Sequence, residues 1–257
     1  GLCPKAVSEY LEEFALLQDD GTYHRETKQR IKAILPMHTF GHPVELDELV
    51  TISKNWNLVL IEDAAESLGS FYKGRHTGTI GQFGTLSFNG NKLITTGGGG
   101  AVLCDSKDSG ERLKHITTTA KIPHPYEFFH DELGFNFRMP NINAALGCAQ
   151  IEKINTFLKQ KRKIAHAYKD FFSETEFQFI EEPEYAKSNY WLNSVMCPDE
   201  ESRVNLLEET NTMGVMTRPI WKLMNKLSMF KNAQCGDLKN SKWLYERVVN
   251  IPSSVTL

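Results

Sequence analysis

Residues 58–70 have the sequence LVLIEDAAESLGS, and residues 87–100 have the sequence SFNGNKLITTGGGG. Asp63 follows a continuous apolar run, and Lys92 stands among glycines after a second short run. A continuous apolar run is typical of a parallel strand that is covered on both faces, and open α/β sheets bind ligands at the carboxyl ends of their strands. The first stretch therefore predicts an α/β fold, with Asp63 at the ligand-binding end of its sheet.

A lysine and an acid are also the two residues that a pyridoxal phosphate (PLP) site requires. A lysine amine condenses with an aldehyde to form a Schiff base, and a carboxylate keeps the pyridine nitrogen protonated so that the ring withdraws electrons. We interpret Lys92 as the residue that carries PLP and Asp63 as the acid that holds the pyridine nitrogen. Residue type and spacing alone do not decide these roles, because Lys92 also fits an ordinary loop and Asp63 and Glu66 also fit helix N-capping.

Three motifs carry a resemblance to a known family: EDAAESLGS (62–70), SFNGNKLITTGGGG (87–100) and GFNFRMPNINAALGCAQIEKI (134–154). With HTFGHPVELDEL (38–49), they resemble the DegT/DnrJ/StrS family of PLP-dependent nucleotide-sugar aminotransferases. TTTAKIPHPYEFFHDELGFN (117–136) and VMTRPIWKLMNKL (215–227) are similar to the branch that makes 4-amino sugars for legionaminic acid and related nonulosonic acids. The resemblance covers most of the chain.

The resemblance implies an aspartate-aminotransferase-like fold (fold type I). We expect a three-layer α/β PLP-binding domain with a mostly parallel or mixed sheet over residues 1–150. A bridging helix and a smaller α+β C-terminal domain follow over residues 151–257. Family members have a further N-terminal part before Gly1, and this sequence has no initiating methionine, so we expect an N-terminally truncated large domain.

The resemblance also assigns residues around the cofactor ring. Lys92 and Asp63 are catalytic and bind PLP, and Ala65 packs under the ring. Glu66 stands where the family often has glutamine or histidine near the ring hydroxyl. Its hydrogen bond is left open, because a carboxyl group donates only when it is protonated.

Two further positions concern the phosphate of PLP. Ser87 donates its hydroxyl to a phosphate oxygen, and Asn136 reaches the phosphate of the other subunit, so the resemblance implies a homodimer with shared active sites. As alternatives, Asn136 fits a turn residue and Arg138 a structural ion pair. Arg218 is a candidate for the diphosphate or hydroxyl groups of the substrate, although a surface arginine fits equally.

The implied reaction converts a 4-keto nucleotide sugar into the 4-amino sugar, with glutamate as the expected amino donor, for surface polysaccharide or nonulosonic acid biosynthesis. A sugar dehydratase on the same fold is disfavoured, because such enzymes have histidine in place of the lysine. A catalytically incomplete fragment remains an alternative. An NAD-dependent enzyme is disfavoured because the sequence has no GxGxxG segment after a first strand.

Composition narrows the remaining function classes. The net charge of −3 gives no electrostatic case for nucleic acid or for an anionic membrane. The five cysteines, an odd and dispersed set without metal-ligand spacing, suit reduced thiols in a cytoplasmic protein. His38 and His42 are separated by Gly41, and Pro43 follows, which argues against a helical metal-ligand pair. We expect no metal, no nucleic acid and no membrane partner.

Apolar periodicity and turn residues predict the order of the elements. Helices are expected over 4–17, 44–56, 108–119, 141–172 and 200–213; strands over 32–37, 58–61, 85–88, 101–104, 189–197 and 215–217; and loops over 18–30 and 119–134. The helix over 141–172 is expected to be packed in its first half, and its KQKRK segment (159–163) is expected to be a solvated basic face.

Overall fold

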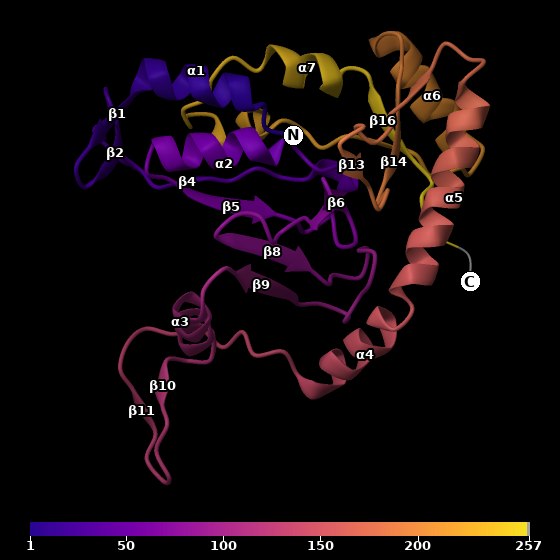
Figure 1. Cartoon of the computed structure of the whole chain (residues 1–257). Coiled ribbons are helices and arrows are strands. Elements are labelled where there is room, and N and C mark those ends of the chain that lie inside the picture. Colours follow the sequence, from indigo (N-terminus) through magenta and orange to yellow (C-terminus); the bar gives the residue numbers. More distant parts are fainter. Residues whose placement is uncertain (256–257) are drawn as a thin grey trace. The chain divides into compact units, whose positions relative to one another are not determined.

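The computed structural model describes residues 1–255 and divides into two compact units (Figure 1). Unit 1 comprises Gly1–Asn155 together with Tyr185–Ser188. Unit 2 comprises Thr156–Glu184 together with the residues from Asn189 onward. Each unit is described by itself.

A mixed four-stranded sheet in the order β4-β5-β8-β9 forms the centre of unit 1. Its strands are β4 (Ala33–Ile34), β5 (Val59–Asp63), β8 (Phe83–Ser87) and β9 (Gly100–Cys104). The β4–β5 and β5–β8 pairs are parallel, and the β8–β9 pair is antiparallel. The expectation of a mixed central sheet in an α/β fold is confirmed.

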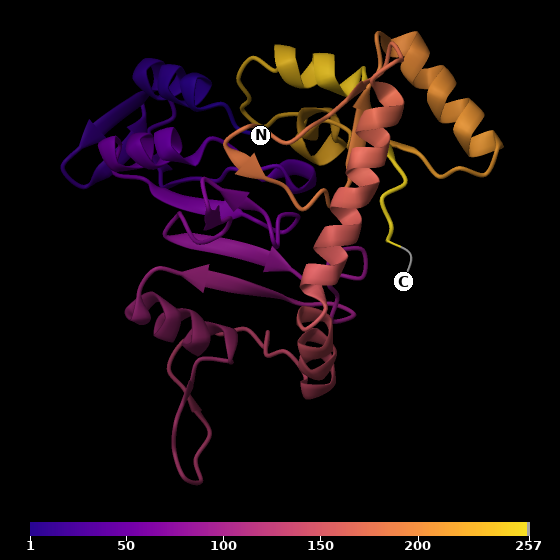
Figure 2. The same cartoon turned by 45° about the vertical axis from the view of Figure 1, so that its right-hand side comes forward.

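Two amphipathic helices cover the β4–β5 side of this sheet. Helix α2 (Leu46–Asn55) packs on β4 and β5, and α1 (Pro4–Phe14) packs on α2, as Figure 2 shows from a second direction. Leu46, Leu49 and Leu60 are at most 1% exposed in the core between them. Burial of these side chains fixes the position of β5, at whose end the candidate site lies.

The segment after α1 differs from the prediction. Instead of a helix to residue 17 and a loop over 18–30, it forms a three-stranded antiparallel sheet of β1 (Ala15–Gln18), β2 (Gly21–His24) and β3 (Arg30–Ile31). The helix ends at Phe14 because Ala15 turns into the sheet and pairs with His24. The sequence of β1, ALLQ, continues the apolar spacing of the helix, and β2 and β3 are too short for apolar alternation to reveal them.

A second small sheet in unit 1 has the order β13-β6-β7. Its strands are β6 (Phe71–Tyr72), β7 (Arg75–His76) and β13 (Ala186–Lys187), and all its pairs are antiparallel. Strand β13 returns from the C-terminal half of the chain, and η1 (Thr39–Gly41) lies in the turn after β4. Residues far apart in sequence therefore support the turns beside β5.

Helix α3 (Lys107–Thr117) is followed by a hairpin of β10 (Lys121–Ile122) and β11 (Phe129–His130). The sequence pattern predicts the helix but indicates a loop where the hairpin forms. In Figures 1 and 2 the hairpin extends away from the sheet beyond α3. Its region exposes large apolar side chains: Tyr126, Phe128, Phe129, Leu133 and Phe137 are 59–85% exposed.

The prediction of a single helix over 141–172 is wrong, because two helices, α4 (Asn141–Ile151) and α5 (Ile154–Phe172), form there and are separated by a turn. In that turn the amide of Lys153 bonds to the carbonyl of Gln150, three residues back. The packed first half is also wrong, because Ile142 is 85% exposed. In the KQKRK segment, Lys161 is 7% exposed, so the expected fully solvated face is contradicted.

Unit 2 contains an antiparallel sheet in the order β12-β14-β16-β15. Its strands are β12 (Gln178–Phe179), β14 (Asn193–Met196), β15 (Arg218–Pro219) and β16 (Val248–Ile251), and its other elements are α6 (Glu200–Thr212), η2 (Met224–Lys226), η3 (Ser228–Phe230) and α7 (Lys239–Tyr245). The strand expected over 215–217 is wrong, because the pairing with β16 begins at Arg218. No helix in the described residues is both long enough and apolar enough to cross a membrane.

Candidate active site

Asp63 is the last residue of β5, and its backbone is fixed on both sides. Its amide donates to the carbonyl of Pro36 at 2.9 Å, and its carbonyl accepts from the amide of His38 at 3.1 Å. Its side-chain Oδ1 accepts from the amide of Ala65 at 3.1 Å. Turns rather than a helix follow Asp63, so helix N-capping explains neither Asp63 nor Glu66.

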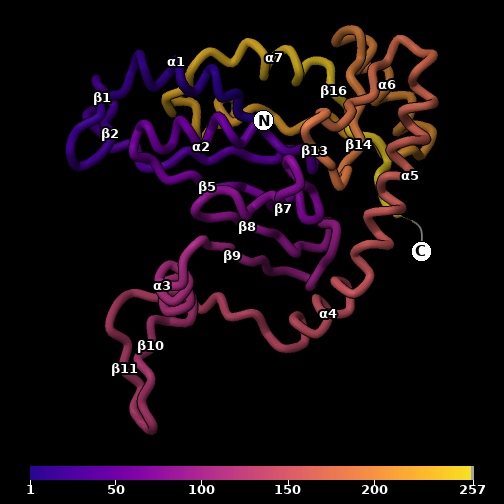
Figure 3. Tube along the Cα trace, in the orientation of Figure 1, coloured from indigo at the N-terminus to yellow at the C-terminus, as the bar shows by residue number. Residues whose placement is uncertain are grey.

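Lys92 lies in the loop that joins β8 to β9. The path of this loop can be traced in Figure 3. Ser87 and Gly100 pair at the base of this loop, and the amide of Phe88 donates to the carbonyl of Gly99 at 2.9 Å. Ile94 is 1% exposed and anchors the loop. A Cβ atom on Gly100 would lie 2.3 Å from the carbonyl oxygen of Leu86, so the close approach of the two strands requires glycine there.

Glu66 brings the two ends of the candidate site together. Its Oε1 lies 3.7 Å from Nζ of Lys92, and the two side chains are 7% and 14% exposed. Its Oε2 accepts from the amide of Phe40 at 2.8 Å. Burial raises the pKa of Glu66, the Phe40 amide and the Lys92 charge oppose the rise, and the Asp63 charge adds to it. The structure thus gathers Asp63, Glu66 and Lys92, as their positions near strand ends predict.

Ala65 lies between Asp63 and Glu66 in the chain, and Ser87 ends β8 at the start of the loop that carries Lys92; both residues are half-buried. The amide of Ala65 is used by Asp63. The hydroxyl of Ser87 accepts from the amide of Asn89 at 3.4 Å, which leaves its own proton to donate.

Asn136 and Arg138 lie on an exposed segment of unit 1. Asn136 forms an isolated antiparallel bridge with Thr118, so the turn alternative is wrong. Within residues 1–255, no hydrogen bond joins Asn136 to the Lys92 cluster, and Arg138 makes no ion pair, so the ion-pair alternative is wrong as well. Arg138 lines a cavity of about 510 Å³, together with Thr118, Lys121, Pro123, His124 and Pro125.

Arg218 belongs to unit 2, at the start of β15. Its guanidinium donates to Oδ1 of Asn211 at 3.1 Å and to the carbonyl of Thr217 at 3.0 Å. It is exposed and is held in one direction by these contacts.

Three contributors beside the site are not predicted from the sequence. The amide of Phe40 carries no side-chain signal, so no motif could have identified it. Glu62 and His38 are both fully buried and hydrogen-bonded at 3.0 Å. The sequence signal for this pair was Glu62 itself, an acid directly after an apolar run. Burial of a carboxylate is strongly unfavourable unless hydrogen-bond donors surround it.

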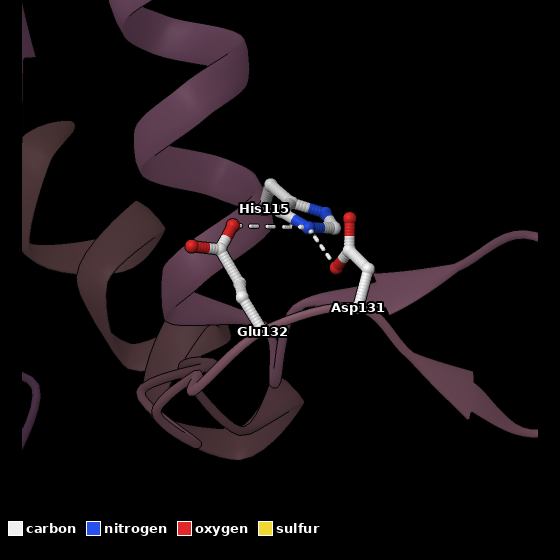
Figure 4. Close-up of side chains that lie close together, drawn as sticks. All are labelled: His115, Asp131 and Glu132. Atoms are coloured by element: carbon white, nitrogen blue, oxygen red, sulfur yellow. Dashed lines mark hydrogen bonds and ion pairs between the residues drawn. The ribbon is translucent and has the colours of Figure 1, made fainter.

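Another cluster of polar side chains lies at the base of the β10–β11 hairpin (Figure 4). Nε2 of His115 lies 2.7 Å from Asp131 and 3.5 Å from Glu132. The guanidinium of Arg112 forms a two-pronged ion pair with Glu132, so a cation at this position would compete with a charge already present. The arrangement is that of an ion-pair network that fastens the chain after the hairpin to α3.

Comparison with known proteins identifies the family of the chain. The model of the DegT/DnrJ/EryC1/StrS aminotransferase family matches residues 21–257. GDP-perosamine synthase of Escherichia coli O157:H7 is 35% identical over 230 residues, which are 89% of this chain and 62% of that protein. The chain therefore spans less than two thirds of the length of this relative.

Solved structures share the fold. PseC of Helicobacter pylori, an aminotransferase involved in the biosynthesis of pseudoaminic acid, superposes with a TM-score of 0.82 at 23% identity, over 86% of this chain and 61% of that chain. Spr1654 of Streptococcus pneumoniae, solved in a PLP form, gives a TM-score of 0.80 at 22% identity, over 88% and 64%. The expected fold type I is confirmed, and the chain belongs to the DegT/DnrJ/EryC1/StrS aminotransferase family.

Proposed function

We propose that this chain provides the lysine-bearing part of a PLP-dependent aminotransferase that converts a 4-keto nucleotide sugar into the 4-amino sugar. The observation that carries the proposal is the convergence of Asp63, Glu66 and Lys92 at the carboxyl ends of β5 and β8. Family membership supports it, since the family is one of aminotransferases. When bound, PLP supplies an electron-withdrawing ring that stabilises the negative charge left on the amine-bearing carbon.

The donors and acceptors present fit this cofactor. Oδ1 of Asp63 is occupied by the amide of Ala65, and no hydrogen bond to Oδ2 is found within the described residues, so Oδ2 is positioned to accept from a protonated ring nitrogen. Ser87 retains a hydroxyl proton that can be donated to a phosphate oxygen. The residues would hold opposite ends of one flat, charged molecule.

Lys92 has two roles in this proposal. Its amine holds the cofactor covalently, and once released it moves a proton between the substrate carbon and the cofactor carbon as general base and acid. The Lys92 side chain is 14% exposed and its Nζ lies next to a carboxyl group, so little water reaches this proton. A dehydratase of the same fold is disfavoured because the lysine is present.

A second copy of the chain completes the site in this proposal. Asn136 lies near the hairpin that exposes Tyr126, Phe128 and Phe129. An apolar surface of this kind on one protomer is typical of a protein interface. We therefore propose a homodimer in which Asn136 of one protomer binds the PLP phosphate held by its partner.

The remaining substrate assignments rest on residue chemistry. Arg218 offers a guanidinium suited to the diphosphate of a nucleotide sugar, with glutamate as the amino donor. The legionaminic acid branch and a cytoplasmic location belong to the same proposal. The alternative is a catalytically incomplete fragment, and whether this chain binds the cofactor decides between the two.

Reductive labelling tests the proposal directly. The 257-residue protein is mixed with PLP, reduced with borohydride and digested, and the modified peptides are mapped by mass spectrometry. Labelling confined to Lys92, and absent from a Lys92→Ala variant, is the expected result. Labelling spread over exposed lysines such as Lys107, or no labelling at all, contradicts cofactor binding by this chain and favours the incomplete fragment.

A further inference from the structure

Glu62 is an acid that the proposed reaction does not use, although it is adjacent to Asp63. Side chains alternate along a strand, so Glu62 and Asp63 point to opposite faces of β5. Glu62 is 0% exposed, and its carboxylate accepts hydrogen bonds on both oxygens. The donors are the amides of Ile80 (2.6 Å) and Gly81 (2.7 Å) on Oε1, and the amide of Gly78 (2.7 Å) and Nε2 of His38 (3.0 Å) on Oε2.

The partners of His38 determine where its proton lies. Nδ1 of His38 accepts from the amide of Val44 at 3.2 Å, so Nδ1 carries the lone pair and Nε2 carries the hydrogen. Nε2 therefore donates to Glu62, and the ring is neutral. The His38 ring is 0% exposed and connects β5 to both ends of the turn formed by residues 38–44.

The 38–44 turn holds a strained residue at its centre. Phe40 is 6% exposed and has φ 58° and ψ 14°, a left-handed conformation that a residue with a bulky side chain adopts only where its surroundings impose it. The carbonyl of Gly41 accepts from Oγ of Ser70 at 2.7 Å and from Oγ of Ser188 at 2.9 Å. Together with His38, these contacts fix the direction of the Phe40 amide.

That amide contacts the candidate active site. It donates to Oε2 of Glu66, and the other oxygen of the same carboxyl group lies 3.7 Å from Nζ of Lys92. An amide that always takes one oxygen leaves the other to face the lysine. The orientation of the 38–44 turn thus decides how Glu66 presents itself to Lys92.

We propose that Glu62 and His38 form a positioning pair for the active site. By fixing the 38–44 turn, they keep the Phe40 amide on one oxygen of Glu66 and direct the other oxygen towards Lys92. The roles of Glu66 and Lys92 rest on the proposed function, whereas the geometry of the pair does not depend on a cofactor.

The charges agree with this arrangement. Burial by itself would raise the pKa of Glu62, but the His38 hydrogen bond and the three amides outweigh it and hold the pKa below its ordinary value. Glu62 therefore stays ionised and keeps its donors. The Phe40 amide opposes the burial that raises the pKa of Glu66, so loss of that amide shifts the titration of Glu66 to higher pH.

Two substitutions at one position separate the links of the pair. In His38→Asn the side-chain oxygen can still accept from the Val44 amide, but the donor to Glu62 is lost. In His38→Gln the side-chain nitrogen can still donate to Glu62, but the acceptor for Val44 is lost. Ser70→Ala leaves the pair intact but removes one of the two side-chain contacts to the Gly41 carbonyl, so it loosens the same turn from another side.

The first readout is hydrogen exchange of the Phe40 amide in the cofactor-free protein. The expected result for His38→Asn is at least tenfold faster exchange at Phe40, with unchanged exchange in strand β16 of unit 2. His38→Gln restores part of the protection. The second readout is the titration of the Glu66 carboxyl carbon by ¹³C NMR, identified by its loss in Glu66→Gln, and it moves to higher pH in His38→Asn.

Unchanged Phe40 exchange and unchanged Glu66 titration in a folded His38→Asn protein overturn the positioning role. If both histidine variants fail to fold, Ser70→Ala decides, because a loosened turn must still move the titration of the Glu66 carboxyl group to higher pH. Faster Phe40 exchange in Ser70→Ala without a change in the Glu66 titration overturns the proposal. PLP labelling of the wild-type protein is scored separately. Failure of Lys92 labelling with intact Phe40 and Glu66 effects refutes the proposed function alone.

Discussion

Glu62→Gln is expected to destabilise the protein strongly although the two side chains have nearly the same shape. The glutamine oxygen can take the place of Oε1 and accept from the amides of Ile80 and Gly81. Its NH₂ group then faces the amide of Gly78, which is also a donor. His38 cannot compensate by moving its proton to Nδ1, because Nδ1 faces the amide of Val44.

The size of the effect follows from this count of donors. At least two buried donors lose their acceptor, and each unsatisfied buried donor costs about 1–3 kcal/mol, which gives about 2–6 kcal/mol in the free energy of unfolding. A typical domain has only about 5–15 kcal/mol in total. Urea unfolding followed by far-UV circular dichroism measures the difference. The exposed Glu48→Gln on α2 is the control and is expected to stay within about 0.5 kcal/mol of the wild type.

The pH dependence of the difference adds a second check. The folded pKa of Glu62 lies below its ordinary value of 4.5, so ionised Glu62 contributes stability that is fully present above pH 4.5. That contribution is lost as the pH falls through the folded pKa, and the gap between wild type and Glu62→Gln must narrow there. A Glu62→Gln protein within about 0.5 kcal/mol of the wild type at pH 7 would refute the hydrogen-bond assignment.

Three other predictions concern the ring acid, the hairpin and a buried lysine. Asp63→Asn is expected to keep the covalent attachment of PLP to Lys92 but to slow the half-reaction with glutamate by about 100-fold or more, since an amide does not stabilise a protonated ring nitrogen. Single-turnover absorbance measures the rate of this half-reaction, and an unchanged rate contradicts the role of Asp63. His115 lowers the pKa of Asp131 and Arg112 lowers that of Glu132, so the ion-pair network that fastens the chain after the hairpin to α3 is complete above the ordinary carboxyl pKa values and weakens as the pH falls through the lowered ones. The protection of the β10–β11 amides, which compares their exchange rate with the intrinsic rate at the same pH, is therefore expected to fall on acidification. It should fall less in Asp131→Asn, where the first ion pair is already missing. Burial lowers the pKa of Lys161 from 10.5 to about 8. Between these pH values the unfolded chain binds more protons than the folded one, so the free energy of unfolding rises with pH by about 3 kcal/mol. Urea unfolding should show no such rise in Lys161→Met, and an equal rise in both proteins argues against the shift.

Apolar pattern was enough to predict the elements that bury a continuous stripe. Helix α2 and strand β5 lie close to their predicted ranges, because Leu46, Leu49 and Leu60 form the core and leave a strong apolar signal. Strands β8 and β9 also lie close to their predicted ranges, although their side chains are mostly only half-buried. The short strands β1 to β3 carry no such signal and are held by backbone pairing. The split between α4 and α5 was also invisible, since neither glycine nor proline marks residues 152–153.

Lys161 shows why charge alone misplaces a side chain. Its neighbours in the KQKRK segment suggest a solvated face, yet its Nζ donates to the carbonyls of Trp191 and Ser253, at 2.8 and 2.6 Å. Those acceptors belong to segments 30 and 92 residues away, and no local pattern encodes them.

The candidate site was predictable to the extent that side chains define it. Asp63 and Lys92 could be expected to converge, because the ends of neighbouring strands meet at one edge of a sheet. The Phe40 amide that holds Glu66 could not be anticipated, because it depends on a left-handed backbone conformation far from Glu66 in the sequence. Arg138 illustrates the reverse case, because its sequence context left a structural ion pair open and no such pair is found within residues 1–255.

The two adjacent acids at the end of β5 also protect the alignment of the strand. A shift of one residue relative to β8 would turn Glu62 outward and drive Asp63 into the pocket of amides from Gly78 to Gly81. The shorter aspartate side chain would then leave buried donors without acceptors, and the open end of the sheet would present the longer glutamate. Only one alignment gives both acids suitable surroundings. A misaligned β5 is therefore less stable, and the loss of stability arises at the position where the proposed chemistry requires an aspartate.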